Sequence, residues 1–386
     1  MIKRFYIFVL LVVSVSQWSS AAERSDSLPA DTTVEKPKNL VGKIIDYFNN
    51  SNQTKPQKDF DISFIGGPHY SSDTKFGIGV VAAGVYRHDK TDTITQPSNV
   101  SIYFDATTSM FFKLGVRGTH FYPGDRMRWS YDVNFASIST KFWGIGYDAA
   151  INDDNESKYK YLTSRAETEF VWRILPNFYA GPKIAFDYVN GRDFEKPELW
   201  LDEADRTFNL GAGLTIKYDS RDNITATTHG TFIAIDQQFN PRFLANKYAF
   251  SLTELTASSF HPLWRGAILA TNLHARLTYG NTPWGLQSTL GGSDTMRGYF
   301  EGRYRDKNEI DACIELRQHI WRRNGVVAWI GAGSIFPRFS DIRLSHVLPN
   351  YGIGYRWEFK RFMNVRLDLG FGRHQTGFIF SINEAF

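Results

Sequence analysis

The sequence predicts an all-β protein, a sixteen-stranded antiparallel β-barrel that crosses a membrane. From residue 60 to residue 386, apolar and polar residues alternate with a period of two, which is the pattern of a strand with one apolar face. The chain is rich in Phe, Tyr, Trp and Gly and has no long runs of helix-forming residues. No apolar stretch is long enough to span a bilayer as a helix, and lipid offers no hydrogen bonds. An exported chain of this kind can therefore cross a membrane only as a closed barrel.

The first 22 residues have the pattern of a cleaved secretory signal peptide. Lys3 and Arg4 precede an apolar run, Phe5 to Val13, and small residues follow at Ser20, Ala21 and Ala22. A membrane anchor is the alternative, but the run has only about half of the ~20 apolar residues that a spanning helix needs. We therefore expect an exported protein, cleaved after Ala22 and located in the outer membrane.

Residues 23–59 are expected to form a periplasmic linker with one short amphipathic helix. The stretch 23–37 is rich in Ser, Asp, Pro and Thr, which is typical of a flexible linker. Within residues 38–50 the apolar side chains recur at helical spacing. This helix could be a lid that packs below or inside the barrel, or it could simply tether the linker. The barrel domain is expected to cover residues 60–386.

The alternation is clear in several segments, for example residues 208–219, 267–279 and 363–372. A soluble β-sandwich would show the same pattern. The segments, however, run to about 10–14 residues, longer than the usual ~5–6 of globular strands. Their polar faces carry many charges, which suits a water-filled lumen, and aromatic residues cluster at the ends of the apolar faces, as in membrane-interface girdles.

Sixteen candidate strands can be counted, which places both chain ends on the periplasmic side. Loops 140–157, 190–205 and 281–308 are then long outer loops, whereas the turns 173–177 and 322–325 are short and periplasmic. The strands are expected near residues 60–66, 76–87, 99–107, 109–120, 127–139, 158–173, 177–190, 206–219, 228–240, 247–260, 266–280, 309–322, 325–336, 347–360, 363–373 and 376–386.

The longest of these loops carries the most specific motif of the chain, within residues 290–303. Its tip, Met296, Arg297, Gly298 and Tyr299, resembles the aliphatic–Arg–Gly–aromatic signature of the BamA/TamA outer-membrane superfamily, also called bacterial surface antigens. The resemblance implies a sixteen-stranded barrel whose sixth outer loop folds back into the lumen. The strand count places this loop between strands eleven and twelve, where the family has it.

A lumen Arg needs carboxylate partners, because a buried unpaired charge is unfavourable. Glu315 lies on the polar face of strand twelve, near the height where the family keeps an acidic partner, so we expect an Arg297–Glu315 ion pair. The next strand of the family carries an aromatic residue, Asp and Gly at alternate positions. Here the same face has Trp329, Gly331 and Gly333, so the Asp is missing and Gly331 is expected to leave room for the loop tip.

The last strand agrees with the resemblance. Gly377, Phe380, Ile382 and the terminal Phe386 resemble the aromatic-ended signal of outer-membrane barrels. The resemblance covers about residues 60–386. The polypeptide-transport-associated (POTRA) domains of the family do not fit in the 37 residues between 23 and 59, so a stand-alone barrel is expected.

Other chemistries lack support. The net charge of +4 is too small to suggest a nucleic-acid binder. The single cysteine excludes a cysteine-based zinc cluster, and the nine histidines form no HExxH motif. No glycine-rich phosphate loop leads into a helix, and there is no GxSxG motif. We therefore expect no enzyme activity, no cofactor and no metal.

The resemblance implies a role in inserting or translocating proteins or lipids across or into the outer membrane. Its partners would be the lipid bilayer, client outer-membrane proteins or lipids, and the barrel-assembly machinery that inserts the chain itself. Strand one ends in Gly66, Gly67 and Pro68, so a weakly paired seam with the last strand is expected. The alternative is a passive or gated pore for small anionic solutes, lined by Lys113, Arg117, Lys183, Lys217, Arg276, Arg356 and Arg366.

Overall fold

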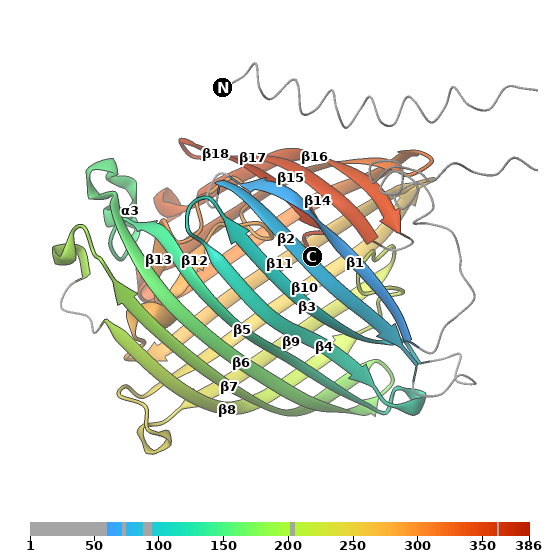
Figure 1. The fold of residues 1–386 in the computed structure, drawn as a ribbon, viewed down its shortest axis with the longest axis horizontal. Coiled ribbons are helices and arrows are strands. Elements are labelled where there is room, and N and C mark those ends of the chain that lie inside the picture. The colour runs from blue at the N-terminus through green and yellow to red at the C-terminus, as the bar shows by residue number, and fades with distance from the viewer. Residues whose placement is uncertain (1–59, 72–74, 88–94, 201–204, 361–362) are drawn as a thin grey trace, which may run out of the picture. The chain divides into compact units, whose positions relative to one another are not determined.

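The computed structural model describes residues 60–71, 75–87, 95–200, 205–360 and 363–386. These residues fold into one large antiparallel sheet with almost no helix, so the predicted all-β fold is confirmed (Figure 1). The predicted signal peptide, linker and 38–50 helix lie outside the described residues. No helix in the described part of the chain is long and apolar enough to cross a membrane.

Sixteen of the described strands belong to the large sheet, and two short ones, β12 and β13, form a separate pair. The strands of the large sheet are β1 (Phe60–Ser71), β2 (Lys75–Tyr86), β3 (Ser98–Thr107), β4 (Phe112–Phe121), β5 (Met127–Phe142), β6 (Ser157–Leu175), β7 (Phe178–Arg192), β8 (Arg206–Asp219), β9 (Gly230–Asn240), β10 (Phe250–Trp264), β11 (Ala267–Gly280), β14 (Asn308–Trp321), β15 (Asn324–Phe336), β16 (Leu348–Lys360), β17 (Met363–Gly372) and β18 (Gln375–Ile382).

The helical elements of the described residues are single turns in the connections between strands. They are η1 (Pro123–Asp125), α3 (Tyr147–Ile151), η2 (Asp153–Asn155), η3 (Pro197–Trp200), η4 (Arg242–Leu244), η5 (Trp284–Leu286), η6 (Phe339–Asp341) and η7 (Leu344–His346).

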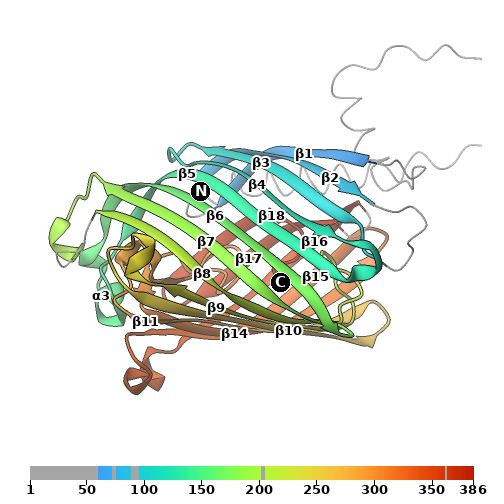
Figure 2. The same cartoon turned by 90° about the horizontal axis from the view of Figure 1, so that it is seen from below.

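Each strand of the large sheet pairs with its neighbour in the chain, and β1 also lies beside β18, so the order of the strands closes on itself (Figures 1 and 2). β1 was expected to end at the Gly66–Gly67–Pro68 stretch. It instead continues to Ser71, with Pro68 in register with Ile78 of β2. Over most of its length β1 has β2 as its only described partner, so a residue without an N–H group can be accommodated in it.

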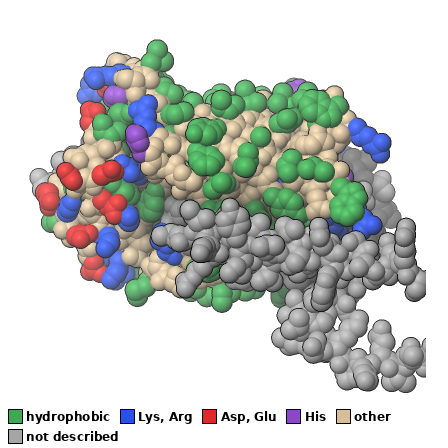
Figure 3. All heavy atoms as spheres, turned by 90° about the horizontal axis from the view of Figure 1, so that it is seen from above, with side chains coloured by type: hydrophobic (Ala, Val, Ile, Leu, Met, Phe, Trp, Pro, Cys, Tyr) green, Lys and Arg blue, Asp and Glu red, His purple; other side chains and the backbone are tan. Residues whose placement is uncertain are grey.

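The two faces of the sheet differ as the alternation predicts. On β14, Ile314 is 52% exposed, whereas its neighbour Glu315 is completely buried. The exposed face is covered by apolar side chains along the flank of the molecule, and charged side chains gather at the end where α3 lies (Figure 3). Three exposed tryptophans lie near the C-terminal ends of β6, β10 and β14, next to the short connections 176–177, 265–266 and 322–323. They are Trp172, Trp264 and Trp321. This arrangement is typical of an apolar belt bordered by interfacial aromatic residues.

Candidate functional site

The longest of the described connections, residues 281–307, joins β11 to β14 and carries the predicted motif. Within it, β12 (Ser288–Leu290) pairs antiparallel with β13 (Tyr304–Asp306). The two short strands close residues 291–303 into a turn with positive φ angles at Gly291, Gly292, Met296, Gly298 and Gly302. The turn lies against the inner face of the sheet, the face opposite the exposed apolar side chains.

Arg297 at the tip of this turn is held by two carboxylates and an aromatic ring. Its guanidinium forms an ion pair with Glu315 on β14 and a second one, at 2.8 Å, with Asp368 on β17. It also stacks on the ring of Trp329 on β15, 3.7 Å from the ring centroid. Only 1% of the Arg297 side chain is exposed. Two charged partners and a π face satisfy a guanidinium that has lost its water.

In the structure Arg297 contacts Glu315 and Trp329. Asp368 was missed as a partner. Its position on the polar face of residues 363–372 was visible in the alternation, but nothing in the sequence told which inward residue would lie at the height of the loop tip. Asp368 lies on β17, two strands along the sheet from Gly331 on β15, the position where the resemblance implies an acidic residue.

Glycines let the backbone of the loop tip touch the backbone of the sheet. A Cβ atom on Gly298 would lie 2.6 Å from the carbonyl carbon of Gly370, and one on Gly370 would lie 2.2 Å from the Arg297 carbonyl oxygen. Gly377 on β18 faces Gly298 in the same way, at 2.9 Å. Gly331 was expected to make this room, but a Cβ there would meet the β14 backbone; the space comes instead from Gly333, whose Cβ would contact Leu290 and Met296.

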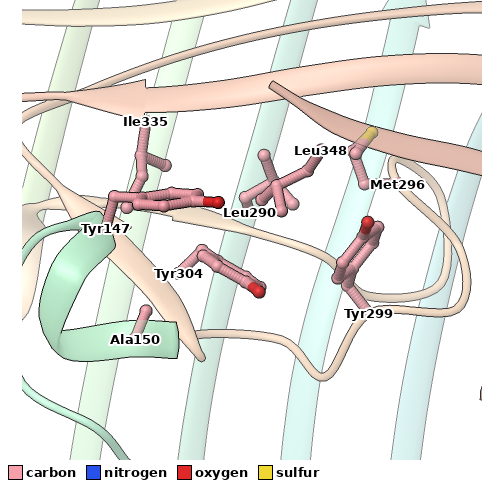
Figure 4. Packing of buried hydrophobic residues seen from close by; sticks show 8 residues of the cluster. All are labelled: Tyr147, Ala150, Leu290, Met296, Tyr299, Tyr304, Ile335 and Leu348. Carbon is pink, nitrogen blue, oxygen red and sulfur yellow. The ribbon is translucent and has the colours of Figure 1, made fainter. Parts of the chain in front are cut away.

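Met296 and Tyr299 belong to a buried apolar cluster that anchors the loop to the sheet and to α3 (Figure 4). The Tyr299 hydroxyl donates a hydrogen bond to the Pro349 carbonyl at 2.6 Å and accepts one from the Arg373 backbone N–H at 2.7 Å. Burial raises the pKa of Tyr299 to about 12, so this hydroxyl stays protonated. The cluster contains Tyr147, Ala150, Leu290, Met296, Tyr299, Tyr304, Ile335 and Leu348.

The carboxylates that bind Arg297 bind further arginines. Glu315 also accepts a hydrogen bond from Arg317 Nε at 2.7 Å. Asp368 likewise accepts one from Arg356 Nη1 at 2.5 Å. Both additional arginines are buried, so the charges around the loop tip form a connected network rather than a single ion pair.

The segment that follows β18 completes this network. Glu384 binds Arg356 at 2.8 Å and lies 3.8 Å from Arg317. Residues 376–386 were expected to form the last strand, but β18 ends at Ile382, and Asn383 takes a positive φ of 69°. Phe386 consequently turns inward, where its ring lies 6.3 Å from the ring of Phe260. Phe380 and Ile382 remain in the strand and are partly exposed.

A profile of the Omp85 superfamily domain matches residues 98–386, which include the whole loop motif and its partners. The chain belongs to the Omp85 superfamily. The BamA/TamA resemblance and an outer-membrane β-barrel location are thereby established. A search of curated protein sequences found no significant match.

Solved structures of Omp85 barrels share the fold at low sequence identity. BamA from Haemophilus ducreyi lacking POTRA domains 1–3 is 12% identical, with a TM-score of 0.55 over 85% of this chain and 71% of that one. CdiB from Escherichia coli is 11% identical, with a TM-score of 0.55 over 85% and 64%. CdiB from Acinetobacter baumannii is 10% identical, with a TM-score of 0.54 over 85% and 60%. The chain thus spans less than two thirds of either CdiB structure.

The opposite part of the inner face of this Omp85 barrel, on β3–β9, has a different character. It borders a polar cavity of about 310 Å³, lined by Arg117, Asp132, Glu167, Glu169 and Lys217 among others. Ion pairs here join nearby strands. Lys183 on β7, for example, binds Glu167 on β6 at 2.7 Å and Asp236 on β9 at 2.8 Å.

Most cations of the predicted anion path have acidic partners. Lys183, Lys217, Arg276, Arg356 and Arg366 each form an ion pair with a carboxylate. The remaining two, Lys113 and Arg117, lie over the ring of Tyr103. Within the described residues, no group of three or more His, Cys, Asp or Glu side chains is placed to hold a metal ion.

Proposed function

We propose that this chain is a sixteen-stranded outer-membrane barrel whose sixth outer loop, residues 281–307, occupies the lumen, and that it assists the insertion or translocation of proteins or lipids. Omp85 proteins act in the outer membrane with lipids and client proteins. The domain boundaries predicted for residues 1–22, 23–59 and 60–386 are part of the same proposal, as is insertion of the chain itself by the barrel-assembly machinery.

The seam between β1 and β18 is the observation that carries this proposal. In the described strands, a single residue pair, Ser71 with Ile379, joins them. By contrast, β17 and β18 share eight pairs, and β1 and β2 share twelve. Separating β1 from β18 therefore breaks few backbone hydrogen bonds and exposes two strand edges to which a client strand could pair.

Locking the seam tests the proposal. Cysteines at Ser71 and Ile379, in a Cys313→Ser background, would form a disulfide across the seam. We expect the locked protein to lose its insertion activity in a reconstituted client-insertion assay and to regain it on reduction. The matched control is a disulfide between Leu369 and Phe378, a paired position within β17 and β18, which should leave activity unchanged. If the seam-locked protein inserts clients as well as the reduced one, lateral opening is wrong.

A pore for small anionic solutes is the second candidate, and the polar cavity next to β3–β9 is the observation that favours it. A lumen that selects anions needs lining cations whose charge is not neutralised by a neighbouring carboxylate. Since five of the seven cations have carboxylate partners, we rank this function second. Planar-bilayer recordings separate the two candidates, because a steady anion-selective conductance would favour the pore.

A further inference from the structure

The 383–386 segment, which follows β18, is held inside the barrel by specific contacts. Asn383 donates its backbone N–H to the carbonyl of Asn364 at 2.7 Å. A backbone oxygen of Phe386 accepts a hydrogen bond from Arg317 Nη2 at 3.0 Å, and the same guanidinium lies 5.1 Å from the centroid of the Phe386 ring. The segment thus occupies a defined place on the inner face.

Glu384 is the charged anchor of this segment. Its carboxylate accepts hydrogen bonds from Arg356 Nε at 2.8 Å and from Asn364 Nδ2 at 2.7 Å, and it lies 3.8 Å from Arg317. Only 7% of the Glu384 side chain is exposed. A carboxylate this deeply buried is stable in its ionised form only while its cationic partners stay in place.

Through Glu384 the charges around the loop tip close into a ring in which cations and anions alternate. Every member is at most 8% exposed. The ring joins five parts of the chain: the loop tip, β14, β16, β17 and the 383–386 segment. Its members, in order, are Arg297, Glu315, Arg317, Glu384, Arg356 and Asp368.

We propose that the 383–386 segment is a latch that couples the seam strand β18 to the loop tip, with Glu384 as the positioning residue that acts on Arg297 through the ring. The inference rests on the proposed function for the importance of the seam, but the coupling itself is a property of the folded chain. Without Glu384 the ring keeps three arginines and only two carboxylates.

Two donors of the ring already lack an acceptor while Glu384 is in place. Arg317 Nη1 and Arg356 Nη2 are already buried without a hydrogen-bond partner. Loss of Glu384 would leave both guanidiniums short of negative charge, and the remaining carboxylates, Glu315 and Asp368, would have to serve them in competition with Arg297. Outward movement of β18 carries Glu384 with it, because the segment follows the strand directly. Opening of the seam therefore loosens the loop tip, and a tight loop tip resists opening.

The single cysteine of the chain provides a built-in probe of the loop tip. The Cys313 sulfur lies on β14, 4.0 Å from Arg297 Nη2, and is partly buried. Its labelling rate with a small thiol reagent, measured on the full chain in outer-membrane vesicles, reports how often the tip moves away. We expect Glu384→Gln to raise this rate at least about ten-fold, because removing one charge from a buried network shifts a local opening equilibrium by that factor or more.

Two further variants separate the latch from general damage. Glu358→Gln changes a partly buried glutamate on the same face of β16, outside the ring, and should leave the rate within about two-fold, as expected for a substitution away from such a network. Glu384→Asp keeps the charge and should restore most of the protection. If Glu384→Gln labels at the rate of the wild type, or if Glu358→Gln accelerates labelling equally, the latch is wrong. Heat-modifiable electrophoretic mobility checks that each variant has folded.

The link to the seam has its own readout. In a Ser71→Cys, Ile379→Cys, Cys313→Ser protein, adding Glu384→Gln should slow disulfide formation several-fold, because β18 is held less firmly beside β1. An unchanged rate would refute the coupling. Neither measurement needs a client or an insertion assay. The latch can therefore fail while the proposed insertion function holds, and the insertion function can fail while the latch holds.

Discussion

Strands β14–β18 and strands β5–β9 both carry many charges on the inner face of the sheet, but they connect them differently. In the first region the ring joins residues far apart in the chain, and its side chains are at most 8% exposed. In the second, ion pairs such as Arg165–Glu167 and Arg165–Asp187 link one strand with itself or with its neighbour, and side-chain exposures in these pairs reach 42%. Buried networks are sensitive to the loss of one partner, whereas solvated pairs contribute little. The two regions should therefore respond to mutation very differently.

Removing Arg297 should cause the largest loss of stability, and it is the most direct test of the difference between strands β14–β18 and strands β5–β9. Arg297→Ala leaves Glu315 and Asp368 buried without their shared cation, which should destabilise the barrel by about 3–5 kcal/mol. Arg165→Ala is the matched control on β6, in a solvated pair, and should cost about 1 kcal/mol or less. Urea unfolding followed by the heat-modifiable mobility shift measures both. Equal losses for the two variants would mean that the two regions do not differ.

A methyl group at Gly298 should have the next largest effect. Gly298→Ala adds a Cβ that would lie 2.6–2.8 Å from the Gly370 and Phe371 backbone, at a φ of 114°. Strain and clash together should destabilise the loop by about 2–4 kcal/mol. Gly292→Ala is a close control, because its φ is 115° but its Cβ would meet nothing nearer than 3.4 Å. The difference between their unfolding midpoints isolates the backbone contact, and its absence would show that the tip is not seated on β17.

The smallest effect concerns Asp306, in β13 of the loop. Burial raises the pKa of its carboxyl to about 6, above that of the unfolded chain. Between about pH 4 and pH 6 the folded loop therefore binds more protons than the unfolded one, and its stability falls as the pH rises through that window.

Asp306→Asn removes this dependence, so the wild type should lose about 2 kcal/mol relative to the variant between pH 4 and pH 7. Unfolding midpoints across this range measure the slope. Asp154→Asn, at an exposed position in another loop, should not change it. A parallel slope in wild type and Asp306→Asn would contradict the argument.

The fold was largely predictable, because alternation reports directly which face each residue takes. The same alternation predicts that Glu315 and Trp329 point inward, towards the loop motif. Alternation does not tell how far each strand is shifted along its neighbour, and that shift decides which inward residues meet. Asp368 and Glu384 were missed for this reason: they reach Arg297 and its partners only through the stagger of β16–β18 and the positive φ at Asn383. The extension of β1 past Pro68 was missed because proline normally ends strands, except where one edge has no partner.

The ring also has a consequence for the order of events as the chain folds. Arg297 precedes Asp368 by 71 residues, and Glu384 comes later still. Contacts of such high sequence separation form late, because the entropy of closing a long loop is lost before the contact contributes any stabilising energy. Until β18 has reached its place, the guanidinium at the loop tip lacks its complete set of counter-charges and is better solvated by water. Burial of this one side chain thus marks the moment at which the wall of the barrel is finished.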